Sequence, residues 1–307
     1  MSTRRDERGQ AMVLTVLFLA VLLGIAAAVM DVGAWYRADR QMQATADASA
    51  LAGAHELPDN HGDAASLALE YAGKNGGGLN GSGISFETKL LPGDTIAVHT
   101  TKPMPGFFSK LFGLNSVTVG ANAKARTGVM NAVRHAAPVA VDKRHPLIQC
   151  MLAKGPAHPD CQQPTELDFD KVGPGAFRLI NIDGSHGGTG PADIGFWIDD
   201  GLDASMPLGW YYSDPGIKPN SSHIKGALES RFNDTLLFPV YDLTRAQGAG
   251  FEYQVIGWVG FTVLRYEIHG VVDARIYGNF TTVIWEGIQS ESPTDPDFGA
   301  RSISLVE

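Results

Sequence analysis

The chain has 307 residues, of which 44% are hydrophobic, so it carries enough apolar side chains to build a core and lacks the composition of a disordered protein. Its formal net charge is -9, and its basic residues form no run beyond Arg4, Arg5 and Arg8. This balance argues against nonspecific binding to nucleic acid, which requires clustered positive charge.

An apolar segment near the N-terminus is long enough to cross a membrane. Residues 12–30 contain no charged side chain and no proline. As a helix, a segment of this length rises about 28 Å, which is close to the hydrocarbon thickness of a bilayer. The small residues at its end run directly into Val29 and Met30, without the break that is typical of a signal-peptidase site. We therefore predict an uncleaved, single-pass transmembrane helix over residues 12–30.

The charges before this segment predict its orientation. Arg4, Arg5 and Arg8 favour a cytoplasmic N-terminus, because positive residues next to a span tend to stay inside. We expect residues 1–11 to form a cytoplasmic tail, the helix to lie in the lipid bilayer of the cell membrane, and the rest of the chain to be extracytoplasmic.

The residues after the span continue the helical pattern and are rich in alanine. Residues 31–54 contain no proline, which predicts that the helix extends into water. Alanines recur there at four-residue spacing in two series: Ala44, Ala48 and Ala52, and Ala46, Ala50 and Ala54. Small residues at this spacing let a second helix approach closely. We predict the series Ala44, Ala48 and Ala52 as a helix-packing face, which packs either on the chain's own domain or on a partner protein.

Three sequence features characterise this N-terminal region. They are Gly9 just before the apolar segment, Asp31-Val32-Gly33 at its end, and the run MQATADASALAGA from Met42 to Ala54. On these features, residues 8–54 resemble the N-terminal segment of the TadE/TadG-like proteins of Flp-type (tight adherence) pilus systems. A looser similarity to TadG-like proteins of high-GC Gram-positive bacteria extends through Asp214-Pro215-Gly216.

The resemblance implies a non-enzymatic, membrane-anchored component of a Tad/Flp-like pilus or surface-appendage assembly system. Its partners would be other proteins of that system, contacted through the N-terminal helix. Prepilins carry Glu five residues after the cleavage-site Gly, where this chain has Leu14, so the comparison favours a TadG-like type that keeps its anchor. TadG-like proteins also often carry an Asp-x-Ser-x-Ser metal site, but Asp183–Gly187 lacks the last Ser and is predicted to be a turn.

The predicted fold class is α+β, in which the transmembrane helix continues into a pilin-like unit over residues 31–127. This unit is expected to combine the long helix with a small antiparallel sheet. Its other predicted elements are a helix over 64–75, strands over 84–88, 96–100 and 117–125, and a short amphipathic helix over 105–114.

The second half of the chain is predicted to be a linker followed by a β-rich α+β domain. Residues 128–175 are rich in proline towards their end and show few periodic apolar positions, which predicts the linker. The domain covers residues 176–307. Its predicted strands are 177–182, 236–241, 251–269 and 271–285, and its predicted helices are 193–202 and 222–233. The two long last strands alternate in polarity and are expected to pair antiparallel.

The two cysteines of the chain lie in the predicted linker. Cys150 and Cys161 are predicted to form a disulfide that closes a short loop, because an exported domain meets an oxidising environment. Free thiols, or a metal site that includes His145 and His158, are the alternatives.

No catalytic constellation is recognisable in the sequence. The histidines form no HExxH or other paired zinc-ligand spacing, and there is no Gly-x-Ser-x-Gly motif. We therefore predict that the protein is not an enzyme and has no cofactor or metal. Acidic clusters at residues 199–203 and 166–170 could hold calcium, but such clusters are more often solvated surface.

The alternative function is a tethered extracytoplasmic module that binds a ligand or an adhesive partner.

Overall fold

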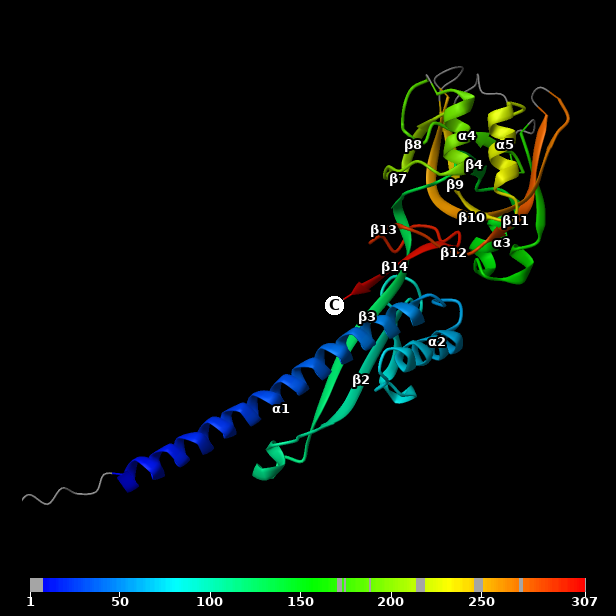
Figure 1. Ribbon diagram of the computed structural model, residues 1–307. Coiled ribbons are helices and arrows are strands. Elements are labelled where there is room, and N and C mark those ends of the chain that lie inside the picture. The colour runs from blue at the N-terminus through cyan, green and yellow to red at the C-terminus, as the bar shows by residue number, and fades with distance from the viewer. Residues whose placement is uncertain are drawn as a thin grey trace, which may run out of the picture. The chain divides into compact units, whose positions relative to one another are not determined.

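The computed structural model describes residues 8–169, 173, 175–187, 189–213, 219–245, 251–270 and 273–306. A long apolar N-terminal helix is followed by β-rich structure with short helices, which confirms the predicted α+β class (Figure 1). The chain divides into two compact units. Unit 1 consists of Met1–Glu87, Thr95–Arg126 and Leu305–Glu307, and unit 2 consists of Thr88–Asp94 and Thr127–Ser304.

The helices and strands are labelled in Figure 1. The helices are α1 Arg8–Ala54, α2 His61–Lys74, α3 Pro146–Lys154, α4 Pro191–Asp199 and α5 Ser222–Ser230, with the short 3-10 helices η1 Gly81–Gly83, η2 Ser109–Phe112 and η3 Pro159–Cys161. The strands are β1 Ile84–Glu87, β2 Thr95–Pro105, β3 Ser116–Val133, β4 Val139–Asp142, β5 Pro164–Asp168, β6 Phe177–Leu179, β7 Met206–Pro207, β8 Gly209–Tyr212, β9 Thr235–Arg245, β10 Glu252–Ile268, β11 Ala274–Thr281, β12 Val283–Ile284, β13 Gly287–Gln289 and β14 Ala300–Val306.

Unit 1 is built on α1, which runs without interruption from the apolar segment into the rest of the unit. This confirms the prediction that the helix continues beyond residue 30. α2 begins after Asn60, whose side chain accepts hydrogen bonds from the backbone N–H groups of Gly62 and Asp63 and so caps the helix. β1, β2 and β3 form an antiparallel sheet in that order. The long β2–β3 hairpin runs beside α1 (Figure 1).

Small side chains allow α1, α2 and β2 to pack closely. Ala50 of α1 and Ala64 and Ala68 of α2 are completely buried. Gly53 lies at the closest approach of the three elements. A Cβ atom at this position would lie 2.6 Å from Cδ1 of Ile96 on β2 and 2.9 Å from the backbone oxygen of Ala64. The absence of a side chain at Gly53 is therefore what lets α2 reach α1.

Replacing Gly53 by alanine is expected to destabilise unit 1 by about 1–2 kcal/mol, because the clash with the α2 backbone outweighs the gain in helix propensity. Gly73 on α2 is the matched control, since nothing lies within 4 Å of a Cβ at that position. Gly73→Ala is expected to stabilise the unit by about 0.5–1 kcal/mol. Amide hydrogen exchange of α2 in the full-length protein measures both changes. Changes of the same sign in the two variants would contradict close packing at Gly53.

Unit 2 contains a larger sheet with the strand order β5-β11-β10-β9-β4-β6, and β8 also pairs with β10. Neighbouring strands of this sheet are antiparallel, except β4 and β9, which are parallel. The antiparallel pairing of β10 with β11 confirms the prediction for these two strands. α4 and α5 pack side by side, and α5 contacts β10. β3 belongs to unit 1 up to Arg126, and its later residues pair with β7 and β13 in unit 2.

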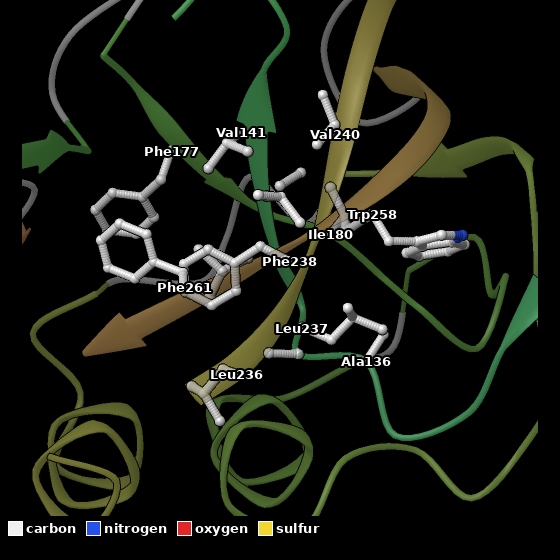
Figure 2. Close-up of a cluster of buried hydrophobic side chains, with 14 of the residues drawn as sticks. Ala136, Val141, Phe177, Ile180, Leu236, Leu237, Phe238, Val240, Trp258 and Phe261 are labelled. Carbon is white, nitrogen blue, oxygen red and sulfur yellow. The ribbon is translucent and has the colours of Figure 1, made fainter. Parts of the chain in front are cut away.

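The core of unit 2 is rich in aromatic side chains and lies on the central strands β9 and β10. Phe238 and Phe261 stack with their ring centroids 5.0 Å apart. Figure 2 shows them in one cluster with Phe177 of β6. Trp258 is 2% exposed and donates its indole N–H to the backbone carbonyl of Met130. These contacts connect strands that lie far apart in the sequence.

The prediction of a linker over residues 128–175 is wrong. β4, α3 and β5 lie in this range, and Val141, Ile148 and Leu167 are buried in the core of unit 2. β4 is buried at all four positions, and α3 and β5 are short, so none of the three gives the extended period by which surface helices and strands are recognised. Unit 2 therefore begins well before residue 176.

Two further predictions differ from the structure. The segment 105–114 contains only the 3-10 helix η2, and its apolar residues lie largely exposed instead of forming one buried helix face. The strand over 251–269 is expected to alternate between buried and exposed residues, but at its centre β10 buries several consecutive residues. A central strand of a covered sheet is buried on both faces. Residues 271–272, where the predicted strand over 271–285 begins, lie outside the described residues.

Candidate assembly site on the N-terminal helix

The apolar part of α1 is almost entirely exposed. Leu14, Phe18 and Leu23 are 61%, 65% and 63% exposed. Apolar side chains exposed over this length suit hydrocarbon surroundings and would be unfavourable in water. Within the described part of the chain, α1 is the one helix that is long and apolar enough to cross a membrane. This helix therefore suggests membrane anchoring.

The part of α1 beyond the apolar segment uses one of its two alanine series for packing inside unit 1. The fully buried apolar residues on this side are Met42, Ala46, Ala50 and Ala54. The predicted packing face differs: Ala44 is exposed, and Ala48 and Ala52 are half-buried. Both series have the same spacing, and the positions of α2 and β2 determine which series is buried. The face of Ala44, Ala48 and Ala52 is only partly covered by unit 1.

The carboxylate of Asp31 connects α1 to the far end of the β2–β3 hairpin. It accepts hydrogen bonds from the backbone N–H groups of Phe107, Phe108 and Ser109 at 3.0, 3.0 and 2.7 Å. Asp31 is only 3% exposed. Burial raises the pKa of Asp31, but the hydrogen bonds from the hairpin together outweigh burial and lower this pKa below its usual value. The ionised acid is thus satisfied by three donors at the end of the apolar segment.

We refer to residues 106–114, which connect β2 to β3, as the hairpin tip. Its side chains Phe107, Leu111 and Leu114 are 73%, 83% and 55% exposed. Between the hairpin tip and α1 lies a cavity of about 270 Å³. It is lined by Ala28, Asp31, Val32, Trp35, Phe108, Ser109 and Leu114. The apolar segment of α1 and the hairpin tip therefore meet at one place.

The role of Asp31 was not predicted from the sequence. Its one local signal is an acidic residue directly after an apolar segment. Its hydrogen-bond donors lie 76 to 78 positions further along the chain, so no local pattern identifies them.

The predicted disulfide is present. Cys150 on α3 is bonded to Cys161 on η3, with the Cα atoms 5.3 Å apart. The histidines of the alternative metal site, His145 and His158, cap α3 and η3, and each accepts a hydrogen bond from the backbone N–H two residues further on. Burial lowers the pKa of His145 to about 4, so its ring is neutral near pH 7 and can accept this bond. Both thiols are used by the disulfide and are not free to ligate a metal as thiolates.

Replacing both cysteines by serine is expected to lower the free energy of unfolding of unit 2 by about 2–3 kcal/mol, because the bond closes a short loop and restricts the unfolded chain. Urea unfolding of the full-length protein in detergent measures this loss. Wild-type protein with the disulfide chemically reduced is the control and should show the same loss. An unfolding midpoint in the double variant that equals that of oxidised wild type would contradict a stabilising role.

The acidic clusters that the sequence offered for calcium have partners in the protein. Asp199 accepts a hydrogen bond from a serine hydroxyl at 2.8 Å, and Asp203 forms an ion pair with an arginine at 3.0 Å. Glu166 and Asp168 lie 3.6 and 3.8 Å from one arginine guanidinium, and Asp170 lies outside the described residues. Among the residues that the structure describes, no group of three or more His, Cys, Asp or Glu could hold a metal ion.

Unit 2 contains a cavity of about 530 Å³. Its lining includes Lys143 and Asp242, which form an ion pair with each other, and Asp295, which accepts a hydrogen bond from Ser290. The lining contains no histidine or cysteine.

The exposed apolar segment, Asp31 and both alanine series all lie on one helix, α1. Residues 9–56 match the Tad family. This family is described as "Putative Flp pilus-assembly TadE/G-like". No curated protein and no solved structure matches the chain.

The Tad match bears out the predicted resemblance for the N-terminal region, because it spans almost all of α1 and ends just after it. The family is a pilus-assembly component and not an enzyme class, and it suggests a Tad pilus component that interacts with other pilus components. The match supports neither the TadG-like subtype nor a Gram-positive source. Asp214-Pro215-Gly216, which carried the looser similarity, lies beyond the matched segment and outside the described residues.

Proposed function

We propose that this protein is a non-enzymatic, membrane-anchored component of a Tad/Flp-like pilus or surface-appendage assembly system. The observation that carries the proposal is the Tad match over residues 9–56, because it falls on the helix with the exposed apolar segment. One helix then supplies both the anchor and a face for assembly. The proposed partners are other proteins of the same system, together with the lipid bilayer around residues 12–30.

The helix is proposed to cross the cell membrane once, with residues 1–11 in the cytoplasm and the rest of the chain outside. The arginines before the span support this orientation, although Arg4 and Arg5 lie outside the described residues. The disulfide supports it independently, since disulfides persist in oxidising compartments. A reporter that is active only outside the cytoplasm, fused after residue 60, is expected to be active. Activity of a cytoplasm-specific reporter at the same position would reverse the orientation.

The anchor is proposed to stay attached, as in the TadG-like type. Leu14 stands five residues after Gly9, where prepilins carry Glu, and this difference supports the absence of processing. Mass spectrometry of the protein from cells with and without the prepilin peptidase is expected to give the same N-terminus. A chain that is shortened only when the peptidase is present would contradict this proposal.

The partner is proposed to contact the face of Ala44, Ala48 and Ala52. This face is exposed or half-buried, whereas the second alanine series, Ala46, Ala50 and Ala54, is buried inside unit 1. Alanine at four-residue spacing allows the backbone of a partner helix to approach closely, and a larger side chain would hold that helix away.

Deletion of the gene, followed by complementation with variants, tests the proposed function. Loss of the protein is expected to reduce pili and adhesion, and Ala48→Leu is expected to reproduce this loss with a normal level of folded protein. Ala65→Leu is the matched control, because it makes the same change at a half-buried alanine on α2. Unchanged pili and adhesion after deletion would contradict the function, and equal effects of the two variants would contradict the proposed face.

The alternative of a tethered binding module is not favoured. The family match concerns pilus assembly, and the charged residues of the unit 2 cavity already interact with protein groups.

A further inference from the structure

We propose that the hairpin tip, residues 106–114, inserts into the headgroup region of the membrane beside α1 and forms a second lipid contact of this protein. The inference rests on the proposed anchoring by α1. It commits to the lipid bilayer as the surface that covers the exposed apolar side chains of the hairpin tip.

The position of the hairpin tip along α1 is the first argument. Asp31 is the first residue after the apolar segment, and three backbone N–H groups of the tip lie 2.7–3.0 Å from its carboxylate oxygens. A helical Cα–Cβ bond tilts towards the helix N-terminus, so this carboxylate is directed towards the span. The cavity between tip and helix also includes Ala28, which lies about 4.5 Å further along the axis, inside the span. The tip therefore overlaps the outer end of the apolar segment.

The composition of the hairpin tip is the second argument. Phe107, Leu111 and Leu114 are each more than half exposed. Lys110 is exposed, and it is the one charged residue within the tip sequence. Apolar side chains with a neighbouring lysine are typical of segments that lie at a membrane surface, because the ammonium group reaches lipid phosphates while the apolar groups enter the acyl boundary. The tip thus has the chemistry of an interfacial segment.

Trp35 is an independent observation at the same place. It lines the cavity between α1 and the hairpin tip, and its indole N–H is buried without a hydrogen-bond partner among the described residues. Tryptophan is enriched at membrane interfaces, where its ring is in an apolar layer and its N–H finds a polar acceptor. A lipid carbonyl or phosphate oxygen that enters this cavity would supply the missing acceptor.

Site-directed fluorescence of the full-length protein in phospholipid vesicles tests the inference. Both native cysteines form the disulfide, so without reductant a single introduced cysteine is labelled selectively with an environment-sensitive fluorophore. The labelled variants are Leu111→Cys at the hairpin tip, Leu22→Cys in the span and Leu69→Cys on α2. Leu69 is the matched control, because it is an exposed leucine of the same unit. Lipids that carry a nitroxide near the headgroup or deep in the acyl chain serve as quenchers.

The Leu111→Cys label is expected to show blue-shifted emission and to lose fluorescence to the shallow nitroxide more than to the deep one. The Leu22→Cys label is expected to be quenched mainly by the deep nitroxide, and the Leu69→Cys label by neither. A tip label that behaves like the Leu69→Cys label, while the span label is quenched, would overturn the insertion and leave the anchoring intact. Loss of quenching at Leu22→Cys would instead overturn the anchoring. A blue-shifted but unquenched tip label would show that protein, such as a second copy, covers the tip, and would also overturn the inference.

Discussion

Trp258→Ala is expected to lower the free energy of unfolding of unit 2 by about 3–5 kcal/mol, because it removes a large, fully packed aromatic side chain. Trp258 is 2% exposed in the core on β9 and β10. Its indole N–H also satisfies the backbone carbonyl of Met130 on β3 at 3.2 Å. The substitution therefore leaves a cavity and removes a donor at the same time. Urea unfolding of the full-length protein, followed through hydrogen exchange of β9 and β10, measures the loss.

Trp210→Ala is the matched control for this prediction. Trp210 on β8 is only half-buried, and its main specific contact is the guanidinium of Arg245 over its ring at 4.2 Å. Such an exposed cation–π contact contributes about 0.5–1 kcal/mol. The loss of unfolding free energy in Trp258→Phe is expected to lie between those of the two alanine variants, since Trp258→Phe keeps an aromatic ring and loses the hydrogen bond. Comparable losses for the two alanine variants would contradict the larger contribution expected from the buried Trp258.

Asp31→Ala is expected to release the hairpin tip from α1. Three backbone N–H groups lose their shared acceptor. Hydrogen exchange at Phe107, Phe108 and Ser109 is expected to approach that of an unprotected loop, while exchange of α2 stays unchanged. Asp39→Ala is the control, because Asp39 is an exposed acid on the same helix. Retained protection in Asp31→Ala would contradict the role of Asp31.

The same contact has a predictable dependence on pH. The pKa of Asp31 is lowered in the folded protein. The stabilisation of the hairpin tip by the ionised Asp31 is therefore fully present at pH values above the ordinary pKa of aspartate, about 4. It is lost as the pH falls through the lowered value. The mobility of a spin label at Leu111→Cys is therefore expected to stay low at neutral pH and to rise only in strong acid. In the Asp31→Ala variant the same spin label should be mobile at every pH. A change in its mobility centred near neutral pH would contradict the role assigned to Asp31.

These two predictions concern different contributions to the proposed function. Trp258 maintains the fold of unit 2 and is expected to affect assembly only through the amount of folded protein. Asp31 keeps the hairpin at the level where α1 leaves the apolar segment. Its loss is expected to leave the protein folded and anchored but to separate the hairpin tip from the helix.

Much of the fold follows from local sequence patterns. The long uncharged run of residues 12–30 and the proline-free continuation predict one uninterrupted helix, since unpaired backbone groups are excluded from hydrocarbon. β11 is predicted by its alternating polarity, and α2 and α5 are predicted by the polar breaks around them. Each of these elements has one buried and one solvated face, which produces such a pattern. The pairing of Cys150 with Cys161 follows from the number of cysteines and the expected compartment.

The elements that local patterns miss are short. β4 is buried at all four positions and therefore shows no alternation, whereas α3 buries only Ile148 and Met151 and, like β5, is too short to give a clear pattern. The hairpin tip shows the opposite case: its apolar spacing resembles a helix face, but the chain there is a short 3-10 turn. In both cases contacts outside the segment decide its structure.

The sequence by itself therefore determined the long apolar helix, its alanine-rich continuation, the α+β class, the disulfide and the resemblance to pilus-assembly proteins. Each of these depends on residues that are close in the chain or on composition alone. Only the tertiary structure decided that Ala46, Ala50 and Ala54 are buried while Ala44, Ala48 and Ala52 are not, because the two series have the same spacing. It also decided that Asp31 holds the hairpin tip, because that contact joins residues more than seventy positions apart, which only the folded chain brings together.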